Sequence, residues 1–303
     1  MPLRPPGSGH PLVLAHGGGR FDILIPTVRD RLPSSGAVRL FNRLIGDRLS
    51  YFRHIRRTLE ARGFDVYEPT VSFAANLEQR SGDLRRAVER VLAPRGPSAK
   101  VSIIAHSMGG LDARYMIARL GMADRVAALV TIGVPHLGSS FADWRLQETH
   151  LGRRLIRWSG QAGLDLRGFE ALTRARCRAL NAEVEALEAA NGVAYFTVAS
   201  AQEREERVFP PLRRAWRLLC EQEGRNDGLV STASQQWTRV LRGHGVEKRV
   251  EQWEFPVPAD HLNQCGWWHP WTGPWRERRA FERTIRDLYL RIAEALRARS
   301  WNS

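Results

Sequence analysis

The chain has 303 residues, a mass of 34.4 kDa and 43% hydrophobic residues, which is enough for one large α/β domain or two small ones. Its net charge is +14, and all but two of its 46 basic residues are arginine. No stretch approaches the roughly 18 consecutive apolar residues that span a bilayer, so we expect no transmembrane segment.

The basic residues and the cysteines exclude several classes of protein. Arginines alternate with acids along helical patterns such as EQRSGDLRRAVER, which indicates solvated helix faces, and no zinc-finger, RRM or KH signature is present. We therefore expect no nucleic-acid partner. Cys177, Cys220 and Cys265 have no metal-ligand spacing, so we expect free thiols, with a Cys220–Cys265 bridge as the alternative. The N-terminus has no separate apolar region typical of a signal peptide, and we expect a cytoplasmic protein.

Apolar strand patterns alternate with helical patterns along the chain. This rhythm predicts a mostly parallel central sheet with helices on both faces, in one domain over 1–303. Strands are expected at 11–15, 64–68, 101–105, 127–132, 194–199 and 249–255, and helices at 50–62, 76–94, 108–120 and 275–299. The segment 138–192 carries only helical pattern, and the segment 200–226 is highly charged; both interrupt the rhythm as insertions on the edge that carries the loops.

A sharp strand-to-helix turn carries the first candidate for chemistry. The β-branched run VSIIA meets His106-Ser107-Met108-Gly109, and an apolar helical pattern follows at once. Small-x-Ser-x-Gly in this context is a nucleophile elbow, in which a strained turn lifts the serine hydroxyl above the sheet edge. The helix N-terminus behind the serine adds positive potential where an oxyanion forms. Ser107 is therefore the predicted nucleophile.

A serine nucleophile needs a histidine base and a carboxylate that orients it, in the chain order serine, acid, histidine. His261 in VPADHLNQ follows the last predicted strand and is the candidate base, with His269 as its rival. Asp227 in GRNDGLVS is the candidate acid, although Asn-Asp-Gly is also a turn sequence. Asp260 is the weaker candidate, because neighbouring side chains in an extended loop point apart.

The remaining histidines and glycines at the strand ends have other expected roles. His16, His106 and His136 lie in turns and are expected to be structural. An oxyanion hole needs two backbone N–H groups, predicted at Met108, after the nucleophile, and at Gly18 in LAHGGGRFD. The same glycines do not supply a dinucleotide fingerprint, so we expect no cofactor.

These residues resemble the bacterial true lipases, the triacylglycerol lipase family of the α/β-hydrolase superfamily. The resemblance runs in order through PLVLAHGGGRFD, LEQRSGDLRRAVERV, VSIIAHSMGGLDARYM, TIGVPHLGSSFADW, NDGLVS and DHLNQ. It implies an α/β-hydrolase fold, a Ser107–Asp227–His261 triad, an oxyanion hole at Gly18 and Met108, and hydrolysis of lipid esters. It also implies a helical cap or lid in the insertion at about 138–192.

The chain departs from the family in two places near the predicted histidine. Many members bind a structural calcium through an aspartate two residues after that histidine, where this chain has Asn263. Because calcium prefers carboxylate oxygens, we expect metal independence, with the loop fixed by packing of Trp267 and Trp268. The segment that follows, CGWWHPWTGPW, is rich in tryptophan, which packs in the interior or contacts acyl chains and interfaces.

The expected activity is a serine lipase or esterase that acts on acylglycerols or related lipid esters through an acyl-enzyme. A phospholipase, thioesterase or acyltransferase on the same triad is the alternative, and a non-catalytic lipid-binding protein of the same fold is the second. The expected partners are the ester substrate and, transiently, a lipid interface. Apolar residues within 151–169 predict either a mobile lid or a fixed cap.

Overall fold

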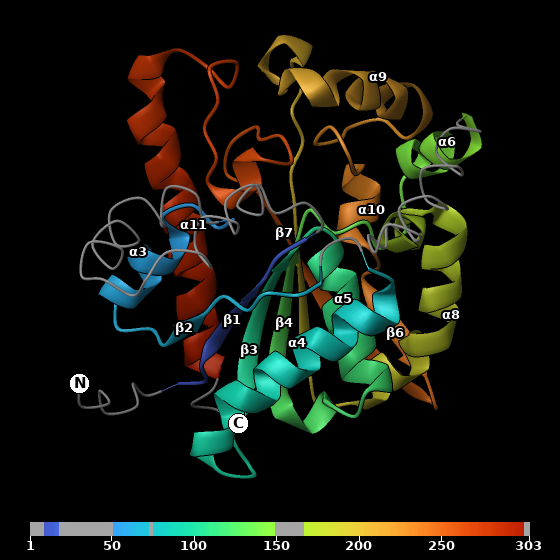
Figure 1. The fold of residues 1–303 in the computed structure, drawn as a ribbon, viewed down its shortest axis with the longest axis vertical. Helices are drawn as coiled ribbons and strands as arrows, with labels where there is room; N and C mark the ends of the chain where they lie inside the picture. Colours follow the sequence, from blue (N-terminus) through green and yellow to red (C-terminus); the bar gives the residue numbers. More distant parts are fainter. Residues whose placement is uncertain (1–8, 18–50, 73–74, 149–166, 300–303) are drawn as a thin grey trace, which may run out of the picture.

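A mostly parallel seven-stranded sheet forms the centre of the computed structural model, which describes residues 9–17, 51–72, 75–148 and 167–299 (Figure 1). Its strand order is β2-β1-β3-β4-β5-β7-β6, and only the pairing of β6 with β7 is antiparallel. The strands are β1 (Leu12–Ala15), β2 (Val66–Tyr67), β3 (Val101–His106), β4 (Val126–Ile132), β5 (Ala194–Ala199), β6 (Val240–Gly243) and β7 (Val246–Glu254). The parallel sheet predicted from the alternating pattern is confirmed.

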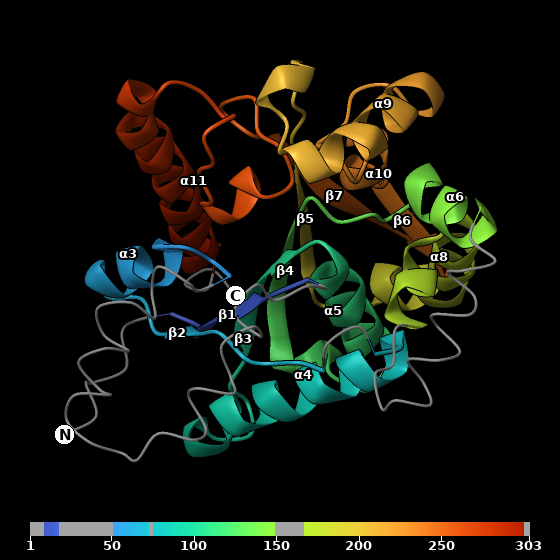
Figure 2. The same cartoon turned by 45° about the horizontal axis from the view of Figure 1, so that its top comes forward.

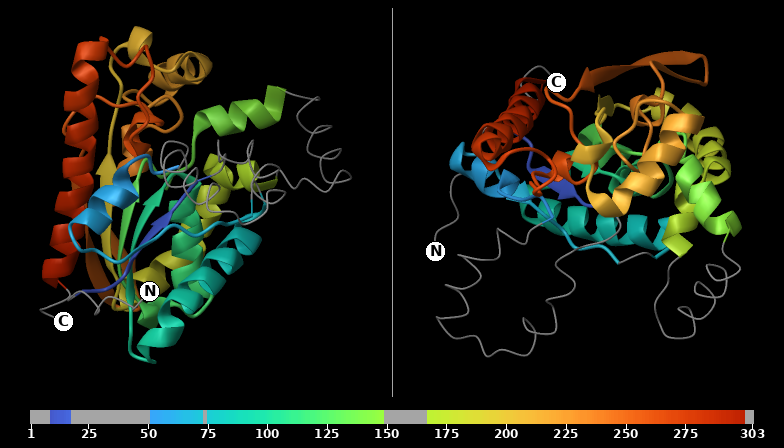
Figure 3. Two further views of the ribbon diagram at one scale, coloured as in Figure 1. Left: turned by 60° about the vertical axis from the view of Figure 1, so that its left-hand side comes forward. Right: turned by 90° about the horizontal axis from the view of Figure 1, so that it is seen from above.

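Helices cover both faces of this sheet, as Figure 3 shows from the side. The two helices α3 (Ile55–Ala61) and α11 (Arg278–Arg299) cover one face. The opposite face packs against α4 (Leu77–Leu92), α5 (Met108–Arg119) and α8 (Arg174–Ala190).

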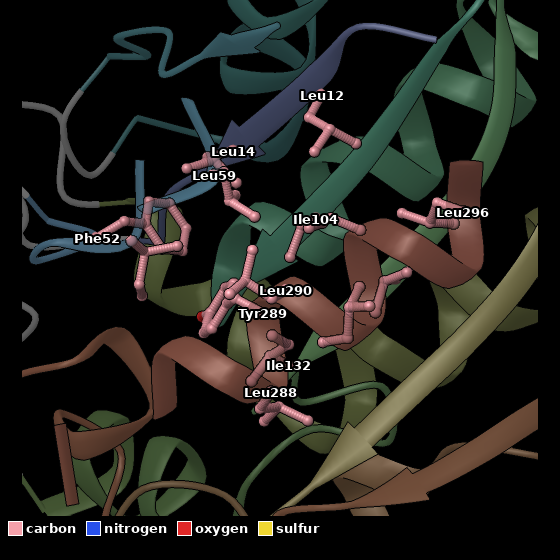
Figure 4. Close-up of a cluster of buried hydrophobic side chains, with 14 of the residues drawn as sticks. Leu12, Leu14, Phe52, Leu59, Ile104, Ile132, Leu288, Tyr289, Leu290 and Leu296 are labelled. Carbon is pink, nitrogen blue, oxygen red and sulfur yellow. The ribbon is translucent and has the colours of Figure 1, made fainter. Parts of the chain in front are cut away.

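The division into two faces follows from the alternation of side chains along a strand. Leu12 and Leu14 of β1 join the core cluster under α3 and α11, whereas Val13 and Ala15 join the cluster under α4 and α5. Figure 4 shows the first cluster, in which Leu288 and Leu296 of α11 lie against the sheet. The closing helix expected at 275–299 is therefore confirmed as α11.

Three shorter helices lie beyond the carboxyl ends of the strands (Figure 2). They are α6 (Ser140–Glu148), α9 (Arg213–Gln222) and α10 (Thr232–Gln236). The insertion at 138–192 is helical where it is described, in α6, a 3-10 turn at Arg167–Leu172 and α8. Residues 149–166, which include most of the segment 151–169 expected to form a mobile lid or a fixed cap, lie outside the described residues.

One strand, β6, was not expected from the sequence. It forms a hairpin with β7 through the two residues His244 and Gly245, both of which have positive φ angles of 51° and 74°. Two consecutive residues in this conformation match the right-handed twist of the joined strands. The available sequence signal was the pair His244-Gly245, since the four residues of β6 are too few to show a periodic pattern and the start of β7 is charged.

Two other expectations concern the whole chain. All three cysteines are free, as expected, and Cys177 and Cys265 are buried. Among the described residues, no helix has both the length and the apolar character needed to cross a membrane.

Candidate active site

Ser107 lies at the turn between β3 and α5, in a backbone conformation that L-residues rarely adopt. Its φ and ψ angles are 55° and −135°, and its backbone N–H donates to the carbonyl of Ile132 on the neighbouring strand at 3.0 Å. A non-glycine residue at positive φ is strained and persists only where surrounding contacts fix it. This geometry is that of the strained turn expected at Ala105–Gly109.

Gly109 allows the start of α5 to approach the end of β1 closely. A Cβ atom at this position would lie 2.6 Å from the carbonyl oxygen of His16 and 2.7 Å from that of Ala15. Any larger residue would push the helix away from the sheet and carry Ser107 with it. The requirement for a small residue after the serine is therefore a steric one.

The side chains of Ser107, His261 and Asp227 lie in one hydrogen-bonded line. His261 Nε2 is 2.9 Å from Ser107 Oγ, and His261 Nδ1 is 2.7 Å from Asp227 Oδ2. Asp227 is fully buried and His261 nearly so. With Nδ1 donating to the carboxylate, Nε2 is free to accept the serine proton, which is the arrangement a serine nucleophile needs.

The sheet brings these three residues together because each follows the carboxyl end of a parallel strand. Ser107 follows β3, Asp227 lies between α9 and α10 after β5, and His261 follows β7. The backbone also joins the last two, since the N–H of His261 donates to the carbonyl of Asp227 at 2.8 Å.

Asp227 lies in a tight turn, as its Asn-Asp-Gly sequence suggested. Its Oδ1 atom accepts from the backbone N–H groups of Leu229 at 2.9 Å and Val230 at 2.8 Å, while Oδ2 faces His261. The turn interpretation and the acid interpretation of this sequence are thus compatible, because the turn fixes the direction of the carboxylate.

The two predicted oxyanion donors differ in how far the structure describes them. Met108 is the first residue of α5, directly after Ser107, so its backbone N–H belongs to the helix N-terminus. Gly18 lies outside the described residues. Its neighbour Gly17 lies against the serine, because a Cβ atom there would be 2.7 Å from Ser107 Cβ and 2.8 Å from the Tyr51 hydroxyl.

The rival histidine and the rival aspartate form a pair with each other. His269 Nε2 lies 2.7 Å from Asp260 Oδ2, and both side chains are buried. Asp260 also accepts from the backbone N–H groups of Phe209, Leu262 and Asn263. Neither residue contacts the Ser107–His261–Asp227 line through its side chain in the described hydrogen bonds, so the structure does not bring these rivals to the site.

Two polar residues near the site were not singled out from the sequence as functional. His106, which was expected to be structural, lies with its ring centroid 4.6 Å from that of His261. Gln264 Nε2 donates to Asp227 Oδ2 at 2.8 Å. The available signals were the position of His106 directly before the serine and that of Gln264 in the DHLNQ block, three residues after His261.

Near Asn263, where the lipases that the chain resembles place a calcium ligand, the side chains do not fit a cation, because Asn263 Oδ1 already accepts from the backbone N–H of Asp260 at 3.2 Å. The amide of Asn263 is engaged within the loop, with Nδ2 donating to the Trp267 carbonyl at 2.8 Å and to Thr272 Oγ1 at 3.0 Å. The carboxylate of Asp260 already accepts hydrogen bonds from His269 and from backbone N–H groups. Across the described ranges no group of three or more His, Cys, Asp or Glu side chains is placed to hold a metal.

The order of the sheet and the turn that carries Ser107 define the α/β-hydrolase fold, as expected from the sequence. Lipase 1 from Pelosinus fermentans shares the fold, with a TM-score of 0.58 at 16% identity over 93% of this chain and 99% of that chain. The mature lipase BlEst2 of Bacillus licheniformis gives a TM-score of 0.57 at 16% identity, over 86% of this chain and 89% of that one.

Sequence comparisons give a more specific likeness. Residues 81–161 match the family model described as "Putative serine esterase (DUF676)". The chain is 27% identical over 164 residues to triacylglycerol lipase 2 of Saccharomyces cerevisiae, covering 46% of this chain and 49% of that protein. It is 37% identical over 99 residues to a triacylglycerol lipase of Pseudarthrobacter phenanthrenivorans, covering 32% and 30%. The matches thus span about half or less of these relatives' lengths, and the resemblance to lipases expected from the motifs is confirmed.

Proposed function

We propose that this protein is a serine hydrolase that cleaves carboxylic ester bonds of lipids, with Ser107 as nucleophile. The observation that carries the proposal is the hydrogen-bonded line from Ser107 Oγ through His261 to Asp227, with distances of 2.9 and 2.7 Å. The likeness to triacylglycerol lipases supports the choice of ester and of lipid.

The proposed reaction has two halves joined by an acyl-enzyme. Ser107 Oγ attacks the ester carbonyl carbon while His261 Nε2 takes the hydroxyl proton, and Asp227 stabilises the imidazolium that forms. The backbone N–H groups of Gly18 and Met108 donate to the oxyanion. The tetrahedral intermediate then collapses, and the alcohol leaves with the proton from His261. Water repeats the sequence on the acyl-enzyme and releases the free acid.

The burial of the carboxylate explains why Asp227 is assigned to orient the base. Asp227 is 0% exposed, and four N–H donors surround its two oxygens, from Leu229, Val230, His261 and Gln264. Such a carboxylate cannot turn away from the imidazole without leaving buried donors unpaired.

Hydrolysis of p-nitrophenyl esters of increasing acyl length tests the proposal. Wild-type protein should release p-nitrophenol, and the preferred length reports the acyl site. Ser107→Ala, which adds no bulk, should remain folded and lose the activity. If wild-type protein acts on none of these esters but acts on phospholipid, acyl thioester or an acyl acceptor in a Ser107-dependent way, then one of the alternative acyl-enzyme activities replaces lipid ester hydrolysis. No activity on any of them would leave only the non-catalytic alternative.

We assign the whole chain to one hydrolase domain with a cap insertion at about 138–192. Support comes from the helical character of this segment where it is described and from α6, which lies beyond the carboxyl ends of the strands (Figure 2), whereas α8 packs against a face of the sheet. Activity on one emulsified ester, followed through its solubility limit, separates the two forms of cap. A rise at the limit indicates a mobile lid, and a smooth saturating curve indicates a fixed cap.

Transient contact with a lipid interface is the second part of the proposal. Trp271 and Trp275 are 45% and 63% exposed, and arginines follow them in the sequence at the start of α11. Helix α11 begins on the side of the sheet where the strands' carboxyl ends lie (Figure 1). Exposed tryptophan next to arginine suits an anionic lipid surface. Replacing both tryptophans by serine should reduce activity on an emulsified ester and leave activity on a dissolved ester unchanged. Equal activities on the emulsion would contradict the contact. A cytoplasmic location stays a prediction.

A further inference from the structure

A buried glutamine joins the carboxylate of the proposed triad to the histidine that precedes the nucleophile. Gln264 is 0% exposed. Its Nε2 atom lies 2.8 Å from Asp227 Oδ2 and 2.6 Å from Ser200 Oγ, and its Oε1 atom lies 2.8 Å from His106 Nε2. All the polar atoms of its side chain are thus hydrogen-bonded.

Elementary chemistry fixes the direction of each hydrogen bond. An ionised carboxylate only accepts, so the amide nitrogen of Gln264 must face Asp227 and the amide oxygen must face His106. His106 Nε2 therefore carries a proton, and its Nδ1 is the acceptor for the hydroxyl of Tyr51, at 2.7 Å. Burial, together with the nearby His261, holds the pKa of His106 well below its usual value, which is consistent with this neutral form.

All the donors in this network point toward the same carboxylate. Tyr51 donates to His106, His106 donates to Gln264, and Gln264 donates to Asp227 Oδ2, the atom that also accepts from His261 Nδ1. Because Oδ2 has no proton to give back, His261 must keep its proton on Nδ1 and leave Nε2 as the acceptor for Ser107. The network therefore favours the tautomer of His261 that general-base catalysis needs.

The space for this glutamine is provided by a glycine on the neighbouring strand end. Gly133, with φ at +61°, directly follows β4, and a Cβ atom on it would lie 2.0 Å from Gln264 Oε1 and 2.9 Å from its Cδ. On the other side Ser200 accepts from the amide and donates to the carbonyl of Ala259, two residues before His261. The amide is thus enclosed by residues after β4 and β5.

We propose that Gln264, oriented by His106 and Tyr51, is a positioning residue that fixes the direction of the Asp227 carboxylate for catalysis. The inference rests on the proposed function, since it assigns Gln264 a role in the same triad. Gln264 acts through Asp227 and His261 and does not touch the reacting atoms. Its loss should therefore lower kcat with little effect on KM.

The test compares Gln264→Leu with Tyr289→Phe. The leucine variant keeps most of the volume of the side chain and removes the donor to Asp227. The control removes an equally buried hydrogen bond, 3.0 Å long, from the Tyr289 hydroxyl to the backbone carbonyl of Gln264, and keeps the amide. We expect kcat to fall by about ten-fold or more in Gln264→Leu, because a hydrogen bond to a charged group is lost, with KM within about two-fold of wild type. Tyr289→Phe should lose thermal stability only.

A conservative variant should show a pH dependence of kcat that a merely structural role of Gln264 would not produce. In Gln264→Glu the new carboxyl group faces Asp227, His106 and the more distant His261, with Tyr51 and Cys265 close by. While protonated it can donate to Asp227, and when ionised it repels that carboxylate. The ratio of its kcat to that of wild type should therefore fall as pH rises from 5 to 8. A ratio that is constant with pH would contradict the proposal.

A reading independent of turnover separates this inference from the proposed function. The proton on His261 Nδ1, shared with Asp227, is expected far downfield in the proton NMR spectrum of wild-type protein. It should shift or broaden in Gln264→Leu and stay in place in Tyr289→Phe. If wild-type protein shows this resonance and the shift but hydrolyses no ester, the proposed function fails and the positioning role stands. If wild-type protein is active and Gln264→Leu keeps its kcat and its resonance, the positioning role is wrong.

Discussion

Two buried histidines in the loop region after β7 each lie against a buried aspartate, at the same distance and in different surroundings. His261 and Asp227 are 2.7 Å apart, and so are His269 and Asp260. In the first pair the second ring nitrogen faces Ser107 Oγ at 2.9 Å. In the second pair, Nδ1 of His269 has no hydrogen-bond partner in the described part of the chain. A close histidine–carboxylate contact is therefore not sufficient to identify a catalytic base. What distinguishes the two histidines is the partner of the second ring nitrogen.

The carboxylates differ in the same way. Asp227 accepts backbone N–H groups from its own turn and directs one oxygen to the base. Asp260 accepts from Phe209, which lies far away in sequence, and from the two residues Leu262 and Asn263 that follow His261. The first pair faces the hydroxyl of Ser107, whereas the second joins two loops. We therefore assign chemistry to one pair and support of the loop that carries His261 to the other.

The largest difference in kcat is expected between variants of the two histidines. His261→Ala should reduce kcat by about 10⁴-fold or more, because the base of the proposed triad is lost. His269→Ala should reduce kcat by less than about ten-fold and lower the melting temperature. Kinetics of p-nitrophenyl butyrate hydrolysis and thermal melts of both variants measure this. Comparable losses of kcat in the two variants would contradict the assignment.

Substitution of the two aspartates should also affect kcat unequally, with a smaller difference than for the histidines. Asp227→Asn should reduce kcat by about 10³- to 10⁴-fold, because an amide in place of the carboxylate no longer holds the Nδ1 proton of His261. Asp260→Asn should leave kcat within about ten-fold of wild type. Steady-state kinetics at saturating ester decides, and the reverse order would exchange the roles of the two residues.

The second pair should contribute to the stability of the fold. Asp260→Ala should lower the free energy of unfolding by about 3 kcal/mol, because three backbone N–H groups and the buried His269 lose their acceptor. His269→Gln, which keeps a polar group of similar reach, is the milder control. Urea unfolding measures both. A loss below about 1 kcal/mol for Asp260→Ala would show that Asp260 does not support the loop that carries His261.

Acid should destabilise the protein through two further buried histidines. Burial lowers the pKa of His106 and of His136 well below 6.5, helped by His261 near the first and Arg114 near the second. Below about pH 6.5 the unfolded chain binds these protons and the folded protein does not, so the free energy of unfolding falls as pH falls. The slope is about 1.4 kcal/mol per pH unit for each histidine. In His136→Gln, urea unfolding at several pH values should show a shallower slope, and an unchanged slope would exclude His136.

The smallest expected effect is that of removing divalent metal. The loop after His261 is held by the amide of Asn263 and by the indole N–H of Trp267, which donates to the carbonyl of Tyr51 at 3.0 Å. EDTA should leave the melting temperature and the esterase activity unchanged. A drop that calcium alone restores would show that an ion holds this loop after all.

Much of the fold follows from local pattern in the sequence. The fully buried β3 strand and the apolar spacing of α11 are continuous signals that periodicity detects. The β6 strand escapes because four residues carry too little pattern and because the hairpin depends on the backbone of His244 and Gly245. The second histidine–aspartate pair escapes for a different reason, since His269 and Asp260 are nine residues apart in a loop with no periodicity.

The site is predictable where chemistry constrains one residue and not where packing constrains several. Ser107 has a local sequence motif, and His261 and Asp227 follow from the order that such a serine requires. The roles of Tyr51 and Gln264 depend on long-range contacts, 55 residues apart for Tyr51 with His106 and 158 residues apart for His106 with Gln264. No pattern in a single sequence reports such pairings.

The central claim is that His261 and Asp227 activate Ser107, and labelling with a fluorophosphonate tests it most directly. The reagent forms a covalent bond to an activated serine, and intact-mass spectrometry with peptide mapping locates it. We predict one label per wild-type chain, on Ser107, with labelling slowed strongly in His261→Ala and only slightly in His269→Ala. A label on another serine, or equal labelling rates in the two histidine variants, would contradict the account.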